Sequence, residues 1–573
     1  MNRDIFSLAE KEFDVTIIGA GMFGVCAAWE AVLQGLSVAL IEKGDFCQAT
    51  SANHYKMVHG GIRYLQHGDI YRIRESSRER SALLRIAPHL VKPLPIVIPT
   101  YGHGMKGKEI LRVGTTLFDI LTADRNTGIL DKERKIPNSK FISKKEVLNL
   151  FPGINKSGLT GAAVFDDAQM YNPPRLVLSF LRSAIEEGVA AANYAEVYDF
   201  LYDGKGVTGV KIKDLINNDA FEIKSKIVLN TAGPWADKLL EESLKLNLNP
   251  KPSFSRDAAF VTSKKPSNEL SLATTLKTKD VDTIFDRGGR HVFIVPWLER
   301  NITMVGVWHV VWPGTKDKIY VTEDELQEFI NEVNAAYPAI DLSIDDVTMV
   351  NTGLTLFGET ALGSKRMSFG KRSLLIDHSK EHSIEGIITL IGVRATIARG
   401  MAKKAVDLIG KKLNKNISKS KTEYLPIFGG KIGIFEEYLA DALKEQNYDL
   451  SSSLMRALIH NYGCEYKEVL KYINEDNSLA EPLQNSTVLK AEIIHAIRNE
   501  MAQSLPDIVL RRTDLGTAGS PGLESLETCA KIAAKEFKWN NDRLERELSH
   551  LKNYFNQKGA IKNYSSSEEV KIQ

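Results

Sequence analysis

The feature that most constrains the fold of this chain lies at residues 13–42. An apolar run leads directly into Gly19, Gly21 and Gly24, and a second apolar run ends on Glu42. This order predicts a βαβ unit that binds a dinucleotide, because the strand, the glycine turn, the second strand and the terminal acid all stand where that unit needs them. A chance glycine-rich turn explains the pattern poorly.

Each residue of this unit has a physical role. Gly19 permits the tight turn, Gly21 lets the backbone approach a pyrophosphate, and Gly24 lets a helix pack on the strand. The predicted helix at 22–34 points its positive end at the phosphates. Glu42 is expected to accept hydrogen bonds from the adenosine ribose, which argues against NADP but does not separate NAD from FAD.

The residues that follow the second strand help to choose between these cofactors. Thr50 and Ser51, and then the segment 56–65, are polar and contain glycine. A simple NAD dehydrogenase usually continues with another βα unit at this point. The sequence therefore departs here from the pattern of such an enzyme.

The segment 42–65, which reads His-Gly-Gly-Ile-Arg-Tyr-Leu at 59–65, resembles the FAD-dependent glycerol-3-phosphate dehydrogenases. That family lies within the glycine/D-amino-acid oxidase group of flavoproteins. The resemblance implies FAD as the cofactor and hydride transfer from an alcohol to the flavin. Further matches occur at 87–90, 166–168, 175–178, 230–237, 500–502 and 507–515.

The resemblance and the coarse pattern together indicate an α/β fold with a FAD-binding Rossmann-type domain, an antiparallel-sheet substrate domain and an α-helical C-terminal domain. At 573 residues the chain is long enough for two or three domains. The expected boundaries are 13–244 for the first part of the FAD domain with an insertion at about 100–150, 245–355 for the substrate domain, 356–410 for the closing part of the FAD domain, and 425–560 for the helical domain. Expected elements include strands at 227–230, 259–262, 291–296, 303–311 and 387–391 and a helix at 175–188.

Beyond the glycine turn, the resemblance assigns further residues to the cofactor. The strand at 387–391 feeds a helix start, which places amides and a positive dipole near the flavin's N1–C2 carbonyl edge. The turn after the strand at 227–230 resembles a second contact with the adenosine half. The cofactor-binding residues implied in this way are Thr50, Ser51, Lys56, His59, Gly60, Gly233, Gly392 and Thr396.

Four residues are candidates for catalysis. The family places the Arg and Tyr that correspond to Arg63 and Tyr64 beside the substrate, although an ion pair of Arg63 with Glu75 or Glu79 is the structural alternative. His309 is the obvious base candidate in the useful pKa range, and a structural His is as good an explanation. Arg394 suits an anion clamp but not a base, because Arg keeps its proton.

Several family motifs are altered in this chain. The family's Gly-Thr-Thr-Asp is replaced by Gly-Val-Trp-His at 306–309, and its Gly-Val-Arg-Pro reads Gly-Leu-Thr-Leu at 353–356, so that the clamp Arg is absent there. The segment 255–258 replaces Lys-Gly-x-His, and a family Lys has become Arg394. Losing one clamp Arg and changing a Lys to Arg reshapes a small phosphate pocket.

Two explanations of these changes are open. In the first, Arg256 and Arg394 rebuild the anion site and the substrate is still glycerol 3-phosphate. In the second, which the residues favour slightly, Trp308 and His309 face a different phosphorylated polyol, a sugar-linked alcohol or an amine. No residue names a better substrate, so glycerol 3-phosphate is the default. A flavin-binding subunit without activity and an amino-acid oxidase are further alternatives.

The composition and the cysteine spacing exclude several classes of binding partner. The net charge is only +2 with 25% charged residues, and no basic block or aromatic-basic stripe suggests nucleic acid. The cysteines lack metal-type spacing, so we expect no metal site, no disulfide framework and a reducing, cytoplasmic compartment. They are Cys26, Cys47, Cys464 and Cys529.

The family also implies an electron acceptor such as quinone. The basic, apolar segment 105–121 is a candidate for a peripheral contact with the inner membrane face, and a surface helix that packs its apolar side inward is the simpler explanation. A small, phosphorylated substrate and a homodimer complete the expected partners.

Overall fold

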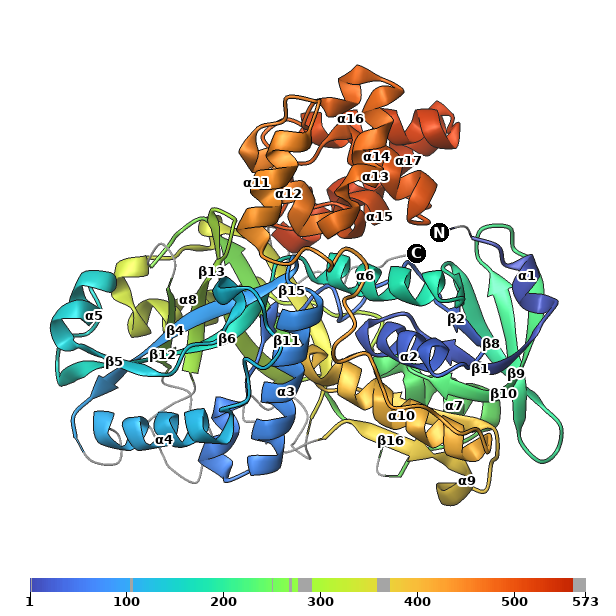
Figure 1. Ribbon diagram of the computed structural model, residues 1–573, viewed down its shortest axis with the longest axis horizontal. Coiled ribbons are helices and arrows are strands. Elements are labelled where there is room, and N and C mark those ends of the chain that lie inside the picture. The colour runs from blue at the N-terminus through green and yellow to red at the C-terminus, as the bar shows by residue number, and fades with distance from the viewer. Residues whose placement is uncertain are drawn as a thin grey trace.

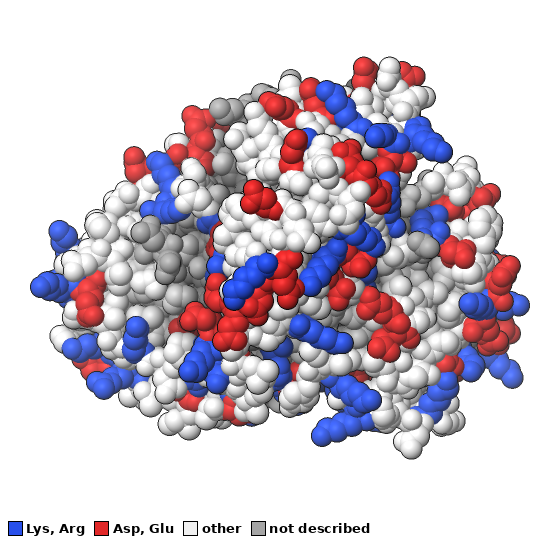
Figure 2. Space-filling view, turned by 45° about the horizontal axis from the view of Figure 1, so that its top comes forward, with Lys and Arg blue, Asp and Glu red and all other residues white. Residues whose placement is uncertain are grey.

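The protein is described by a computed structural model in which residues 1, 3–103, 107–249, 251–266, 270–276, 291–357 and 372–559 are placed. Two sheets lie side by side, and a group of helices, orange to red in Figure 1, packs across the top of both. Over the face that Figure 2 shows, basic and acidic side chains are interspersed, as a chain with 74 basic and 72 acidic residues leads one to expect.

The first sheet contains the predicted dinucleotide unit. Its central strand β1 (Glu12–Ile18) lies between β10 (Ala220–Asn230) and β2 (Val38–Ile41), and all three are parallel. Six of the seven residues of β1 are buried, as a strand covered on both faces requires. The remaining strands are β16 (Leu374–Asp377), β17 (Ile387–Ile391) and β7 (Ala190–Ala192) in the order β16-β17-β10-β1-β2-β7, with β8 (Ala195–Tyr202) and β9 (Val207–Asp214) forming a meander beside β10.

Three helices cover one face of this sheet. Helix α2 (Met22–Leu33) runs between α6 (Pro173–Glu186) and α10 (Ala398–Lys412) and contacts both of them. Helix α6 begins two residues before the expected start, because the Asn172 side chain accepts a hydrogen bond from the amide of Arg175 and two prolines occupy the first turn.

The second sheet is mostly antiparallel and carries the expected substrate domain. Helix α8 (Glu323–Ala336) packs on one of its faces. Strands that precede residue 245 also belong to this sheet. The sheet therefore contains strands from both sides of the expected boundary between the FAD domain and the substrate domain. Its strands are β3 (Met57–Val58), β4 (Val91–Tyr101), β5 (Lys140–Ser143), β6 (Leu159–Met170), β11 (Phe254–Thr262), β12 (Ser271–Thr275), β13 (His291–Trp297), β14 (Ile302–Val311) and β15 (Val347–Leu356), in the order β15-β11-β14-β13-β12-β4-β6-β3 with β5 on β6.

The helical C-terminal domain has its own apolar core. The described helices are α11 (Phe435–Glu445), α12 (Ser452–Tyr462), α13 (Tyr466–Leu470), α14 (Lys490–Asn499), α15 (Leu505–Asp507), the π-helical turn η11 (Ile508–Arg512), α16 (Leu523–Phe537) and α17 (Asn541–Gly559). The amino terminus reaches this domain, since the Met1 amino group donates to the carbonyl of Asn499 over 2.7 Å.

The other helices lie around the two sheets. They are α1 (Phe6–Ala9), α3 (Ile70–Ile86), α4 (Lys108–Leu121), α5 (Lys144–Leu150), α7 (Ala236–Leu244) and α9 (His378–Glu381). Among the residues that are placed, no helix combines the length and the apolar character needed to cross a bilayer.

Candidate cofactor and substrate site

The glycine turn after β1 is packed so tightly that side chains are excluded from it. Gly19 has φ +93°, and a Cβ there would lie 2.8 Å from the carbonyl oxygen of Thr231. A Cβ on Gly24 would lie only 1.9 Å from the carbonyl oxygen of Gly19, where helix α2 meets the strand. Both positions therefore have the physical roles predicted for them.

The amino end of α2 faces a hydroxyl from the segment after β2. Gly21 is the residue just before the helix, and the amide of Met22 donates to Ser51 Oγ over 3.0 Å. A Cβ on Gly21 would meet that same oxygen at 3.0 Å. The bare backbone, the helix end and the hydroxyl together suit a diphosphate.

Glu42 stands at the end of β2 with its carboxylate held in place. Its two oxygens accept hydrogen bonds from the amides of Ala20 at 2.8 Å and Gly44 at 2.9 Å. Burial raises the pKa of Glu42 above its ordinary value, although the two amides act in the opposite direction. Each oxygen keeps a lone pair for the ribose hydroxyls expected at this place.

Three neighbouring parallel strands bring their loops to one edge of the sheet. Gly19 follows β1, Gly233 follows β10 and Gly392 follows β17, and in an open α/β sheet this carboxyl edge is where ligands bind. Gly233 has φ +57° with nothing within 4 Å of a Cβ, whereas a Cβ on Gly392 would lie 2.1 Å from the Phe23 ring. The fold topology thus brings together residues from separate segments that the sequence analysis assigned to the cofactor, and this assignment stays a prediction.

The His-Gly-Gly segment meets the loop after β17. The amide of His59 donates to Thr396 Oγ1 over 3.2 Å, and His59 Nδ1 lies 3.1 Å from Asp167 Oδ2. The amide of Gly60 donates to the other oxygen of Asp167 over 2.6 Å. Burial alone would raise the pKa of Asp167, but the hydrogen bond and charge of His59 hold it below its ordinary value.

Asp167 was not among the predicted site residues. The sequence contained a signal for it, because the segment 166–168 is one of the stretches that resemble the family. Its partners were not predictable from spacing, since His59 lies on a loop that precedes it by about a hundred residues.

Thr50 and Lys56 link the cofactor turn to the second sheet. Thr50 Oγ1 donates to the carbonyl of Leu354 over 3.3 Å, and a Cβ on Gly353 would lie 2.9 Å from the Thr50 side chain. Lys56 is buried, with its Nζ 4.5 Å from the centroid of the Trp297 ring. A contact of Lys56 with the flavin stays a prediction.

A basic pocket of about 140 Å³ lies between α3, α10, the residues just before β16 and the loop after β17. Four positively charged side chains and one carboxylate, that of Glu75, line it. The four are Arg72, Arg372, Arg394 and Lys404. The pocket therefore carries an excess of positive charge and suits an anion.

The contacts inside the pocket connect it with Tyr64. The guanidinium of Arg394 lies 4.9 Å from the centroid of the Tyr64 ring, and that of Arg72 lies 5.3 Å from it. Arg394 also donates to Ser76 Oγ over 3.0 Å. Sequence reasoning found Arg394 and Tyr64 but missed Arg72, Arg372 and Lys404. These three come from α3, the residues before β16 and α10, and only tertiary packing brings them together.

Arg63 lies in the 3-10 turn Ile62–His67, directly before Tyr64. Of its two alternative partners, Glu75 is paired with Lys404 at 2.8 Å and Glu79 with Arg399 at 2.9 Å. The role of Arg63 toward the substrate stays a prediction.

His309 is paired with a carboxylate on the neighbouring strand. Its Nδ1 lies 2.9 Å from Asp257 Oδ1, and Ser255 Oγ donates to the same oxygen over 2.7 Å. Burial acts to raise the pKa of Asp257, but the charge and hydrogen bond of His309 lower it below its ordinary value. Asp257 is opposite Gly353 in the sheet, and Gly353 contacts Thr50 of the cofactor segment.

Two residues invoked for a rebuilt or altered substrate site lie elsewhere. Arg256 is buried and paired with Glu325 of α8, to which the indole N–H of Trp308 also donates over 2.8 Å. Trp308 stacks on Phe329 of the same helix at 4.3 Å between centroids. Neighbouring residues of a strand point to opposite faces, so Arg256 and Trp308 pack under α8 while Asp257 and His309 do not.

Known protein families and proteins match most of this chain. The family described as FAD dependent oxidoreductase matches residues 14–370, and the family described as C-terminal domain of alpha-glycerophosphate oxidase matches residues 420–544. A glycerol-3-phosphate dehydrogenase of Synechocystis sp. is 28% identical over 567 residues, which cover 97% of this chain and 98% of that protein. An aerobic glycerol-3-phosphate dehydrogenase of Staphylococcus haemolyticus is 28% identical over 90% of this chain and 89% of its own length.

Solved structures show the same fold. The glycerol-3-phosphate dehydrogenase of Bacillus halodurans, complexed with FAD, superposes with a TM-score of 0.75 at 22% identity and covers 99% of this chain and 98% of its own. The L-proline dehydrogenase of P. horikoshii superposes with a TM-score of 0.50 at 16% identity over 73% of this chain and 97% of its own. The three-part α/β fold predicted from the sequence is confirmed.

Proposed function

This chain belongs to the family of FAD-dependent oxidoreductases, and we propose that it oxidises the secondary alcohol of a phosphorylated polyol, by default glycerol 3-phosphate to dihydroxyacetone phosphate. The observation that carries the proposal is the basic pocket around Arg394. The relatives named glycerol-3-phosphate dehydrogenase, which are similar over nearly the whole chain, support the same substrate class.

The residues at the carboxyl edge of the first sheet fit FAD. The glycine turn, the amino end of α2 and Ser51 would hold the diphosphate, and Glu42 would hold the ribose. The loops at Gly233 and at 392–396 lie along the same edge. When bound, FAD supplies the hydride acceptor.

We assign the phosphate of the substrate to the basic pocket. Arg394 and Arg372 would grip its oxygens with planar donors, and Tyr64 would border the bound polyol. Arg256 is already paired with Glu325. We therefore assign the replacement of the family's missing Arg to the cations of the pocket rather than to the second sheet.

We assign the hydroxyl proton to His309. Asp257 holds Nδ1 of the ring, so the proton would be taken at Nε2, and the carboxylate would stabilise the imidazolium that forms. The ionised state of Asp257 is favoured by its lowered pKa. The substrate then leaves as a ketone after losing a proton and a hydride.

Anaerobic stopped-flow measurement of flavin absorbance tests the proposal. Glycerol 3-phosphate or another phosphorylated polyol should bleach the bound flavin, whereas glycerol, amino acids and amines should not. Reduction by an amino acid would contradict the proposal and indicate an amino-acid oxidase. If no compound of the panel reduces the flavin, the result would instead indicate a flavin-binding subunit without activity.

We propose quinone as an electron acceptor, reached through a peripheral membrane contact at α4. That helix buries Leu111 and Phe118 against the protein but leaves Val113, Leu117 and Ile120 exposed at 65%, 45% and 67%. It thus has a packed apolar side and a second, exposed one. Leu117→Glu should abolish sedimentation with phosphatidylglycerol vesicles, while Leu523→Glu on the helical domain should not. Equal sedimentation of both variants would contradict the membrane contact.

A further inference from the structure

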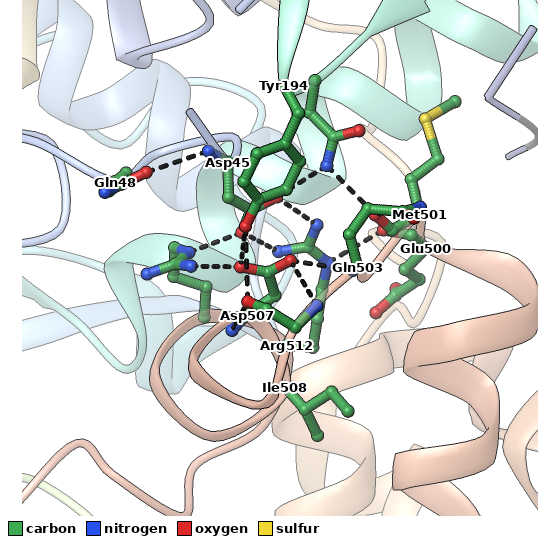
Figure 3. A network of polar contacts seen from close by, with 12 residues as sticks. Asp45, Gln48, Tyr194, Glu500, Met501, Gln503, Asp507, Ile508 and Arg512 are labelled. Atoms are coloured by element: carbon green, nitrogen blue, oxygen red, sulfur yellow. Dashed lines mark hydrogen bonds and ion pairs between the residues drawn. The ribbon is translucent and has the colours of Figure 1, made fainter. Parts of the chain in front are cut away.

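The helical C-terminal domain reaches the cofactor-binding unit through a buried cluster of charges (Figure 3). The guanidinium of Arg512, in η11, binds the Asp45 carboxylate with two parallel hydrogen bonds of 2.7 Å. Arg511, the preceding residue, donates its Nε–H to the same carboxylate. The side chains of Asp45 and Arg512 are fully buried and that of Arg511 is 7% exposed.

Neighbouring groups complete the cluster and fix its geometry. Asn193 Nδ2 donates to Asp45 over 3.0 Å and to the carbonyl of Met501 over 3.0 Å. Tyr194 donates its hydroxyl to Asp507 over 2.7 Å, and Arg511 binds Asp507 as well. Residues of the cofactor-binding unit and of the helical domain therefore share one buried hydrogen-bond network.

Asp45 stands in the loop that shapes the ribose and diphosphate sites. It lies three residues after Glu42, whose carboxylate accepts from the amide of Gly44. The amide of Cys47 donates to the carbonyl of Ala20, inside the glycine turn, over 3.2 Å. The same loop continues to Ser51, which caps α2. A displacement of Asp45 would therefore move several groups that face the cofactor.

The cluster is sensitive to the loss of one charge. Burial alone would raise the pKa of Asp45, but the charges of Arg512 and Arg511 hold it well below its usual range. Removing one partner from a buried ion pair leaves the others unpaired, which disturbs the site more than a surface pair would.

We propose that Arg511 and Arg512 are positioning residues for FAD: through Asp45 they hold loop 43–48 in the conformation that binds the cofactor, so that the helical domain sets the affinity of the first sheet for FAD. The proposal rests on the family's cofactor and is independent of the substrate. It gives the helical domain a role in cofactor binding although its helices lie above the sheet that carries the glycine turn.

The release of FAD from the holoenzyme tests the proposal. In Asp45→Asn, a nearly isosteric change, FAD fluorescence should report dissociation at least tenfold faster than in the parent. Arg498→Gln is the matched control, because Arg498 lies in the same domain and pairs with Glu475 and Glu536 near the surface, away from the cluster. Its FAD release should equal that of the parent. A variant Asp45→Asn that melts earlier yet releases FAD at the parent rate would show a merely structural role and overturn the proposal.

Coupling to Glu42 separates positioning from general loosening. If Asp45 acts through the loop that presents Glu42, the effects of Asp45→Asn and Glu42→Gln on FAD release should be less than multiplicative when combined. Fully multiplicative effects would overturn the proposed route.

A measurement on the parent protein covers the case in which the variant does not fold. Hydrogen exchange of the amides in 505–513 should slow on FAD binding if the cluster and the cofactor site share one conformation. Identical exchange in the apo and FAD-bound forms would contradict the proposal.

Discussion

The guanidinium of Arg394 lies 4.9 Å from the centroid of the Tyr64 ring, although the two residues come from opposite ends of the FAD-binding half. Tyr64 follows the His-Gly-Gly segment, and Arg394 follows strand β17. Their contact joins two candidate catalytic residues in one basic pocket. It also locates the altered family motif, in which Arg394 replaces a Lys, in this basic pocket.

We expect Arg394→Gln to weaken binding of a phosphorylated substrate. A hydrogen bond to a charged group contributes about 1.5–3 kcal/mol, so KM should rise about 10- to 100-fold while kcat changes less. Steady-state kinetics with glycerol 3-phosphate measures this. Arg546→Gln, the same charge change at an exposed position of α17, is the control. A KM within twofold of the parent would remove Arg394 from the substrate site.

Arg63→Ala tests the residue beside Tyr64. If Arg63 touches the substrate, the loss of its charged donors should slow flavin reduction about tenfold or more at limiting substrate. If instead it is a structural residue, the variant should melt earlier but reduce as fast as the parent. Stopped-flow bleaching and thermal unfolding of the same preparation distinguish the two outcomes.

The glycine turn was predictable because its causes are local. Gly24 is required by its contact with the carbonyl oxygen of Gly19, five residues earlier, and Gly19 by its own φ of +93°. Gly24→Ala would place a methyl 1.9 Å from the carbonyl oxygen of Gly19.

We therefore expect Gly24→Ala to lose about 1–3 kcal/mol through overpacking and to bind FAD about 10- to 100-fold more weakly. Fluorescence titration with FAD measures the change. Gly114→Ala, whose new methyl would meet only a Leu65 side-chain carbon at 3.3 Å, should bind FAD as the parent does. Parent-like affinity in Gly24→Ala would contradict the close helix–strand contact.

The substrate site was less predictable because tertiary packing decides which of its residues lie next to one another. Arg72 and Lys404 meet only when α3 packs beside α10, and no spacing in the sequence reports that. The assignment of both Trp308 and His309 to the substrate ignored a signal that was present, since strand neighbours point to opposite faces. The link between Asp45 and Arg512 joins two domains and is likewise invisible in either segment alone.

His309→Asn tests the proposed proton acceptor. A positioned general base contributes about 10²- to 10⁴-fold, so flavin reduction should slow by that factor with KM nearly unchanged. Asp257→Asn should slow it less, because the ring stays but loses the carboxylate that orients it. The control is Asp324→Asn, the same carboxylate-to-amide change at an exposed position of α8, on the other side of the sheet. Equal rates in His309→Asn and the parent would leave His309 as a structural residue.

Glu492, in the core of the helical domain, makes stability depend on pH. Burial and the nearby charge of Asp514 raise the pKa of this carboxyl to about 8, although the amide of Leu489 acts against them. The folded protein thus binds the proton more tightly than the unfolded chain, whose Glu titrates near 4.3. The contribution of the Glu492 proton to the free energy of unfolding is complete below about pH 4.3. It is lost as pH rises toward 8, at about 1.4 kcal/mol per pH unit.

Thermal unfolding between pH 5 and 9 checks this sign. The melting temperature of Glu492→Gln should rise relative to that of the parent as pH rises, because the neutral amide needs no proton to stay buried. Glu524→Gln, an exposed residue of α16, should follow the parent at every pH. A difference between Glu492→Gln and the parent that is constant across this range would show that Glu492 does not titrate within it.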